Sequence, residues 1–355
     1  MLNSEELKVW RKMGEQLASG HEVEAMSEEW LAKMEKEQTL YNHGMVRLLP
    51  GGWLYPASYL EYADRIYNFK FRSSDVVVMT MPKSGTTWMQ EILWTMLHNP
   101  DLNHPQADEP IYHRSPEIDL DMILDGKGLE GVSIDHFMKA FQDTCPGRKL
   151  EDGMAFQMCE LISDPRVIKS HLPLSLLPSD LLDQAKVVYV ARSPKDVVVS
   201  LYYFFRVMKL FSFTGSFDSF VKHFMNNDLI YTPYWLHVKE AWQKRDHPNM
   251  HFVFYEDLQS DIMTQLQKIN DFMGTNLTQK QLTNVAENSS FVSMKSRGEP
   301  VKDMGVFIPD AHKELGGYFR KGIVGDWRNH FSPQLEEEMN QWIQSHARDI
   351  GITFK

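Results

Sequence analysis

A lysine, a glycine and three hydroxyl residues stand together in the stretch VVVMTMPKSGTTW, where an apolar run gives way to the pattern TTWMQEILWTMLH. The apolar run predicts a buried strand, and the second pattern predicts a helix. At such a turn, backbone N–H groups converge and the helix dipole favours negative charge. Gly85 lets a ligand approach the backbone, and Lys83 adds a positive charge. Hydroxyl donors come from Ser84, Thr86 and Thr87. The turn therefore predicts a phosphate-binding site.

A plainer explanation of this turn is that its hydroxyls cap the helix and that Lys83 is a solvated surface charge. The turn is also not a Walker A loop, because its lysine precedes its glycine and the chain has no GxxxxGK[ST] sequence. A nucleoside triphosphate with magnesium is therefore not the expected ligand.

A second junction of strand and helix lies in VVYVARSPKDVVVSLYYF. Arg192 ends the strand. The next residues predict the start of a helix: Ser193 and Asp196 form an S-x-x-D capping pattern, and Pro194 suits the first helical position. Arg192 at the mouth of the sheet and Ser200 in the second helical turn could hold a second phosphate. The structural alternatives are a carboxylate partner for Arg192 and a bond from Ser200 to a helix carbonyl.

Two further stretches place cations and a histidine beside expected strand ends. In YFRKGIVGDW, Arg320 and Lys321 precede Gly322, and paired cations beside a flexible glycine suit a phosphate. In VIKSHLPLSLLP, Lys169 and His171 follow a strand, and a histidine there can take up a proton near neutral pH. Alone, such a loop is more often solvated and such a histidine structural. Three phosphate-type motifs on neighbouring strand ends favour a functional site.

The elements that must position these residues form an alternating pattern. Short apolar runs at 76–81, 167–169, 186–191 and 251–255 predict buried strands. Helical patterns lie between them, and one of these ends at Gly274, a predicted C-cap. The alternation predicts an α/β single domain with a central parallel sheet flanked by helices. Its ligands should bind at the carboxyl ends of the strands.

Composition narrows the class of protein. The chain has 355 residues, 43% of them hydrophobic, and a formal net charge of −11, which argues against a general nucleic-acid binder. Cys145 and Cys159 form no metal-binding spacing, and so few thiols suit a reducing compartment, here the cytoplasm. No stretch reaches the ~18–20 apolar residues of a membrane span, and no motif predicts a metal site.

Five motifs in this order, PKSGTTW, KSHLPLSLLP, ARSPKDVVVSLYYF, FYEDL and RKGIVGDWRNHF, closely resemble the cytosolic sulfotransferases. The resemblance runs from residue 45 to 355, after an extension at 1–44 that is expected to be helical or mobile. It implies a P-loop-like strand-loop-helix that binds phosphosulfate. The implied donor is 3′-phosphoadenosine 5′-phosphosulfate (PAPS), the implied product is 3′-phosphoadenosine 5′-phosphate (PAP), and the implied acceptor is a small-molecule hydroxyl or amine.

The same resemblance implies a role for each matching residue. The 5′-phosphosulfate would be bound by Lys83, Ser84, Gly85, Thr86 and Thr87, and the adenine would stack on Trp88. The 3′-phosphate would be bound by Arg192, Ser200, Arg320, Lys321 and Gly322. Further adenosine contacts would come from Tyr255, Ser289, Phe291 and Met294. His171 would be the catalytic base, with Lys83 and Lys169 stabilising the reacting group.

Two departures from the family bear on partners and acceptor. The usual dimer motif KxxxTVxxxE is replaced by RNHFSPQLEE, so a homodimer is possible but its usual motif is altered. The second departure is the irregular segment 99–165, which lengthens the distance in sequence between Lys83 and His171. As a substrate lid, this segment would suggest a bulky apolar acceptor; as a surface excursion, it would have no such role. Retinol dehydratases share such an insertion, and they sulfonate an allylic alcohol and then eliminate the sulfate.

Two other classes compete with a sulfotransferase. A P-loop metabolite kinase needs an acidic residue at a strand end for magnesium, and FVFYED could supply Glu256 or Asp257. A nucleotide-binding carrier without activity should have lost its catalytic groups, yet His171, Lys83 and Lys169 are all present.

Overall fold

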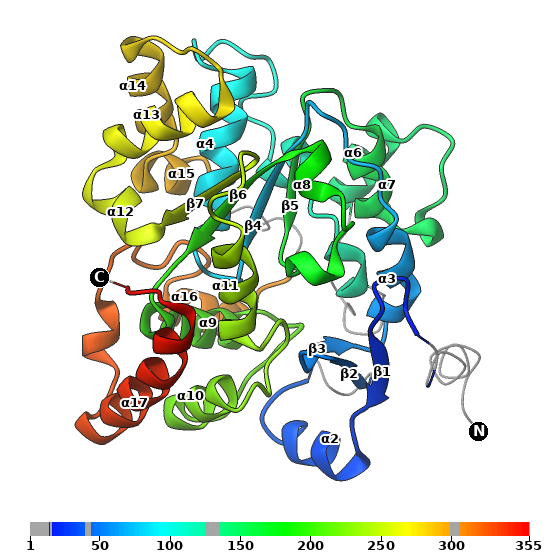
Figure 1. Ribbon diagram of the computed structural model, residues 1–355, viewed down its shortest axis with the longest axis vertical. Helices are drawn as coiled ribbons and strands as arrows, with labels where there is room; N and C mark the ends of the chain where they lie inside the picture. The colour runs from blue at the N-terminus through cyan, green and yellow to red at the C-terminus, as the bar shows by residue number, and fades with distance from the viewer. Residues whose placement is uncertain (1–13, 15, 40–43, 125–134, 299–304, 355) are drawn as a thin grey trace.

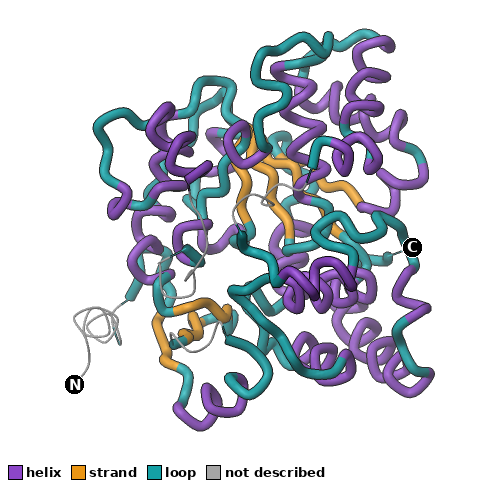
Figure 2. The backbone as a smooth tube through the Cα atoms, turned by 180° about the vertical axis from the view of Figure 1, so that it is seen from behind, coloured by secondary structure: helices purple, strands orange, loops and turns teal. Residues whose placement is uncertain are grey.

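A computed structural model describes residues 14, 16–39, 44–124, 135–298 and 305–354. Its strands form one parallel and one antiparallel sheet (Figures 1 and 2). The parallel sheet, of order β5-β4-β6-β7, contains β4 (Val76–Thr80), β5 (Val167–Ser170), β6 (Lys186–Ala191) and β7 (Met250–Phe254). The antiparallel sheet, of order β1-β2-β3, contains β1 (Glu22–Ala25), β2 (Met45–Leu49) and β3 (Trp53–Pro56). The α-helices are α2 (Glu28–Met34), α3 (Tyr59–Tyr67), α4 (Thr86–His98), α5 (Ile111–Arg114), α6 (Asp135–Thr144), α7 (Met154–Leu161), α8 (Leu181–Gln184), α9 (Pro194–Val207), α10 (Phe217–Met225), α11 (Tyr234–Gln243), α12 (Tyr255–Ser260), α13 (Ile262–Met273), α14 (Gln279–Asn288), α15 (Phe291–Ser296), α16 (Pro309–Leu315) and α17 (Pro333–Ile350).

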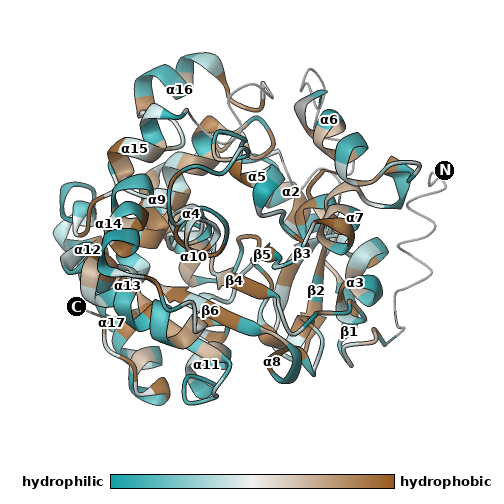
Figure 3. Cartoon of the chain, turned by 90° about the horizontal axis from the view of Figure 1, so that it is seen from above, coloured by the Kyte–Doolittle hydropathy of each residue, from teal (hydrophilic) through white to brown (hydrophobic). Residues whose placement is uncertain are grey.

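Hydrophobic cores lie on both faces of the parallel sheet. Val76 and Val78 of β4 pack with residues of α4, α13 and α14, whereas Val77 and Met79 pack with residues of α9 and α11. This alternation follows from the two-residue repeat of a strand. Figure 3 shows the apolar character of β4 and β6. Because both faces are covered, near-continuous apolar strands are stable here. The predicted α/β fold, with a central parallel sheet flanked by helices, is confirmed.

The predicted strands are confirmed, but one predicted helix cap is wrong. Ser193 makes no side-chain bond at the start of α9. Instead, Asp196 accepts hydrogen bonds from the N–H groups of Gly325, at 2.7 Å, and Trp327, at 3.3 Å. The carboxylate therefore anchors a distant loop rather than its own helix. Gly274 does end α13 in the left-handed region, with φ 71°, as predicted.

The N-terminal sheet crosses the predicted domain boundary at residue 45. Val23 of β1 lies opposite Leu48 of β2, and Met34 of α2 packs against Met45 and Leu54. The described part of the predicted extension is thus strand and helix packed against the remaining chain. Residues 1–13, 15 and 40–43 lie outside the described residues.

The predicted insertion at 99–165 contains α5, α6 and α7, and its residues 125–134 lie outside the described part of the chain. Phe137 and Phe141 of α6 form a separate hydrophobic cluster with Met158 of α7, Val207 of α9 and Phe307. The segment therefore packs against the helix that follows β6.

The segment that replaces the usual dimer motif forms the start of α17. Ser332 caps this helix by accepting a hydrogen bond from the N–H of Leu335, and Pro333 occupies the first helical position, where no N–H is needed. Among the described helices, none is long and apolar enough to cross a membrane.

A buried ion pair joins Arg166 to Asp75, with side chains 1% and 0% exposed. The Nε atom of Arg166 donates to Oδ1 of Asp75 at 2.7 Å.

We expect Asp75→Asn to lower the free energy of unfolding by about 3–5 kcal/mol, because it leaves the Arg166 charge buried without a counter-charge. Urea unfolding measures this loss. The control is Asp164→Asn, which removes the ion pair between Arg72 and Asp164. The side chains of this pair are 43% and 49% exposed, so the free energy of unfolding should fall by at most about 1 kcal/mol. Equal small losses would contradict the prediction.

Candidate functional site

A cavity of about 310 Å³ lies where the parallel strands end. Most of the residues selected from the sequence line this cavity, although they are far apart in the chain. They are Lys83, Gly85, Thr86, Thr87, Trp88, Lys169, His171, Arg192, Ser200, Tyr255, Phe291, Met294, Arg320, Lys321 and Gly322. Their convergence follows from the parallel sheet, in which the carboxyl ends of β4, β5 and β6 share one edge.

The turn between β4 and α4 has the conformation that its glycine suggested. Gly85 has φ 106°, and a Cβ atom there would lie 2.7 Å from Cδ2 of Tyr255. Lys83 also lies in the left-handed region, with φ 68°. Its Nζ atom is 4.4 Å from the ring centroid of Phe204 and 4.3 Å from that of Tyr318, so aromatic faces stabilise the ammonium group.

Three donors around this turn are buried without a hydrogen-bond partner among the described residues. They are Oγ of Ser84, Nε1 of Trp88 and Nε of Arg192. A buried donor left unpaired costs free energy, so such a cluster is suited to a ligand rich in acceptor oxygens. Arg192 is held in place because its Nη1 donates to the carbonyl of Lys83 at 3.0 Å and its guanidinium lies 4.2 Å from the ring centroid of Tyr255. The residues present therefore fit a phosphate-bearing ligand.

The glycine-rich loop places two cations on one carboxylate. Arg320 and Lys321 each lie 2.7 Å from a carboxylate oxygen of Asp326. Burial raises the pKa of Asp326, but the hydrogen bonds from Lys321 and its neighbours outweigh burial and hold that pKa well below its usual value. One carboxylate cannot neutralise two cations, so the loop keeps a positive charge. A side chain at Gly322 would collide with Phe291.

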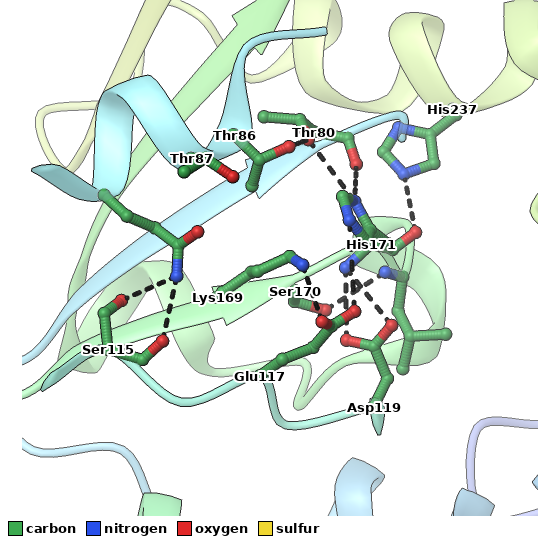
Figure 4. A network of polar contacts seen from close by, with 12 residues as sticks. Thr80, Thr86, Thr87, Ser115, Glu117, Asp119, Lys169, Ser170, His171 and His237 are labelled. Carbon is green, nitrogen blue, oxygen red and sulfur yellow. Dashed lines mark hydrogen bonds and ion pairs between the residues drawn. The ribbon is translucent and has the colours of Figure 1, made fainter. Parts of the chain in front are cut away.

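His171 lies beside the turn between β4 and α4, because Oγ1 of Thr80 contacts both Thr86, at 2.6 Å, and Nδ1 of His171, at 3.3 Å (Figure 4). Its Nδ1 lies 2.8 Å from the carbonyl oxygen of Thr80. Since a carbonyl only accepts, Nδ1 carries the proton and Nε2 has a free lone pair. Burial lowers the pKa of His171 well below its usual value, and the charge of Lys169 lowers it further. The lowered pKa favours neutral His171, the form in which an imidazole can accept a proton.

Two carboxylates that sequence reasoning missed adjoin His171. Glu117 Oε2 lies 2.6 Å from Nζ of Lys169, and its Oε1 lies 3.9 Å from Nε2 of His171. Asp119 accepts from the backbone N–H of His171 at 3.1 Å. Burial, followed by the negative charge of Glu117, raises the pKa of Asp119 to about 7. Both residues lie in the irregular segment 99–165, where no motif marks them.

The rest of the lining is mainly apolar, and its polar members are Gln90, Ser115, Glu117, Lys209 and Gln259. Its apolar lining consists of Ile111, Tyr112, Leu120, Ile123, Leu124, Phe137, Leu201, Phe204, Phe205, Met208, Leu210, Phe211, Ile230, Tyr231 and Val306. Several of these come from the segment 99–165. Tyr231 has φ 71°, which is strained for a side chain of its size, and its ring centroid is 5.4 Å from that of His171. The base thus faces an apolar compartment.

Three selected residues do not face the cavity. Ser84 is buried and does not line the cavity, and Ser289 donates its hydroxyl to the carbonyl of Val285 at 2.7 Å. Glu256, which with Asp257 is one of the two carboxylates that the kinase alternative could use, accepts from the N–H of Ser193 at 2.8 Å. Within the described residues, no group of three His, Cys, Asp or Glu side chains is arranged to hold a metal ion.

Comparison with known proteins identifies similar chains. A family model described as "Sulfotransferase domain" matches residues 73–351. Sulfotransferase 1E1 of Homo sapiens is 30% identical over 307 residues, which cover 86% of this chain and 94% of that protein. Sulfotransferase 1A1 of Mus musculus is 33% identical over 300 residues, 84% of this chain and 92% of that protein. A solved structure of retinol dehydratase in a complex with retinol and PAP is 30% identical, with a TM-score of 0.79 over 94% of this chain and 99% of that one.

Gly85→Ala tests the geometry of the turn. We expect it to lower the free energy of unfolding by about 1–3 kcal/mol, because alanine is strained at φ 106° and its Cβ meets Tyr255. The control is Gly274→Ala, a left-handed helix end with nothing within 4 Å, which should cost about 1 kcal/mol. Thermal or urea unfolding measures both. A smaller loss at Gly85 than at Gly274 would disprove the close approach of Tyr255.

Proposed function

The chain belongs to the cytosolic sulfotransferase family, whose donor is PAPS and whose nucleotide product is PAP, and from this we propose that it sulfonates a hydroxyl or amine of a small apolar acceptor. The observation that carries the proposal is the position of Nε2 of His171. This atom faces the boundary between a cationic compartment and an apolar one. A base at that boundary can act where donor and acceptor meet.

We assign the donor to the cationic compartment. Lys83 and the turn that follows it would bind the phosphosulfate, and the unpartnered donors of Trp88 and Arg192, which line the cavity, support this assignment. Arg320 and Lys321, with Arg192, Ser200 and Gly322, would bind the 3′-phosphate. Phe291, Tyr255 and Met294 would contact the adenosine. Ser289 would contribute only if its hydroxyl left the carbonyl of Val285.

The chemistry then follows from the side chains at the boundary. The acceptor oxygen attacks sulfur while the bond from sulfur to the 5′-phosphate oxygen breaks, and that oxygen leaves with the electron pair. His171 takes the acceptor's proton at Nε2, a contribution typically worth ~10²–10⁴-fold in rate. Lys83 and Lys169 offset the negative charge that shifts between oxygens, and losing one such group costs about 3–4 kcal/mol.

The apolar compartment supports an apolar alcohol as acceptor. Residues of the segment 99–165, including Ile111, Leu120 and Phe137, form part of its wall. We propose that this segment acts as a lid over the acceptor. A second candidate function is elimination after sulfonation, supported by the similarity to retinol dehydratase. In that case a carbon-bound proton is lost, sulfate leaves with the bonding pair, and a new C=C bond remains.

We place the protein in the cytosol. Its two cysteines are buried and free, which suits a reducing compartment, and the curated relatives are sulfotransferases of the same type. A homodimer would need contacts other than the family's usual motif, since Ser332 and Pro333 serve here as the start of α17.

Thermal shift with PAP, compared with ATP plus magnesium, tests the donor assignment. PAP at 100 times its Kd should stabilise the protein by ~2.7 kcal/mol. A shift with ATP and magnesium alone would favour the kinase alternative.

Retinol and androsterone with PAPS then test the acceptor: a sulfate ester indicates transfer, whereas free sulfate with a dehydrated product indicates elimination.

Arg192→Ala tests the nucleotide site. We expect the Kd for PAP to rise about 10- to 100-fold, because charge-assisted bonds to a phosphate are lost. The matched control is Arg245→Ala, which removes a half-exposed arginine that packs on Trp242. Calorimetric titration with PAP measures both. Similar affinities in the two variants would show that the 3′-phosphate binds elsewhere.

His171→Ala tests the base. We expect sulfonate transfer to fall by at least about 100-fold while PAP binds with near-normal affinity, because His171 acts on the acceptor and not on the nucleotide. Product formation from PAPS and PAP titration measure the two effects separately. Full activity would remove His171 from the mechanism.

A further inference from the structure

Glu117 is a carboxylate in a cavity that is lined by apolar, neutral polar and cationic residues, and the mechanism above gives it no role. It is the one acidic residue among the described residues that line the cavity, and its side chain is 12% exposed. Its charge is matched by Lys169 at 2.6 Å. A buried ion pair is expensive to form, so its presence beside the proposed base requires an explanation.

The backbone fixes Glu117 beside β5. The N–H of Lys169 donates to the carbonyl of Pro116 at 2.9 Å, and the N–H of Ile118 donates to the carbonyl of Lys169 at 3.0 Å. Glu117 thus pairs with Lys169 in a parallel β-bridge. Residues 116–118 therefore extend the sheet by one short step, and Figure 4 shows the carboxylate of Glu117 pointing toward Lys169 and His171.

The charges around His171 explain why a carboxylate is needed there. Lys169 and Lys83 both lower the pKa of His171, in addition to its burial. Asp119 also faces it, at its backbone N–H, as does His237, whose Nε2 lies 3.1 Å from the carbonyl of His171. The ring of Tyr231 lies 5.4 Å from that of His171. A neutral imidazole between two ammonium groups is a weak base, because the imidazolium that it must form is repelled by both.

We propose that Glu117 is a positioning residue for sulfonate transfer, which pairs with Lys169 and stabilises the imidazolium of His171 once Nε2 has taken the acceptor's proton. The inference rests on the proposed function. Oε1 is 3.9 Å from Nε2, too far for a hydrogen bond to neutral histidine but close enough for an attraction between charges. No bond to Glu117 forms or breaks in this step.

Phenols of different acidity distinguish this role from a structural one. At pH 8, 4-nitrophenol is largely ionised and needs little help from a base, whereas phenol keeps its proton. We expect Glu117→Gln to lower kcat about tenfold with phenol but less than about threefold with 4-nitrophenol, with KM for each acceptor nearly unchanged. His171→Ala, as a reference, should show the same acceptor preference more strongly.

The conservative variant and the control complete the experiment. Glu117→Asp keeps the charge and should recover most of the activity with phenol. The control is Glu109→Gln. The carboxylate of Glu109 lies 3.2 Å from His113, is 54% exposed and does not line the cavity. This variant should therefore leave kcat with both phenols unchanged. The Kd for PAP and the Tm show that each variant is folded.

Equal losses of kcat with the two phenols, or a loss confined to KM, would overturn the proposal. Failure of Glu117→Asp to restore activity with phenol would also count against it. A wild-type protein that binds PAP but transfers sulfonate to neither phenol nor to retinol or androsterone would instead refute the proposed function, and this inference with it.

Discussion

The parallel pairing of β4 with both β5 and β6 is the constraint on which the site depends. Met79 lies opposite Ser170 on one side and opposite Tyr189 on the other. This register brings the Thr80 carbonyl within 2.8 Å of Nδ1 of His171 and places Arg192 beside the carbonyl of Lys83. His171, the turn at Lys83 and Arg192 therefore share one edge of the sheet, although they are far apart in the chain.

Gathering so many cations at one buried edge has an electrostatic cost, which the structure offsets locally. Aromatic faces accept the ammonium of Lys83. Asp326 compensates Arg320 and Lys321, and Glu117 compensates Lys169. The chain as a whole carries −11, so the cationic cavity is a local feature rather than a property of the surface.

The compartments that we propose for donor and acceptor are built from different kinds of segment. The donor side uses turns directly attached to buried strands, where the backbone is fixed by the sheet. The acceptor side uses residues of the segment 99–165 and of the helices after β6, which pack on each other in a separate cluster. Such packing is easier to vary than a sheet register, so one family can keep its donor while its acceptors differ.

The sequence alone determined the strands, the fold class and most of the residues that meet at the cavity, because each depends on local patterns: apolar runs, glycine at a turn, and cations beside it. It misassigned Asp196, whose local S-x-x-D pattern suggests a helix cap although the carboxylate bonds to Gly325 and Trp327. It also missed Glu117, because an isolated glutamate in an irregular segment resembles any surface glutamate. Only the tertiary structure decided which carboxylates meet which cations, since those partners are selected by packing between segments distant in sequence.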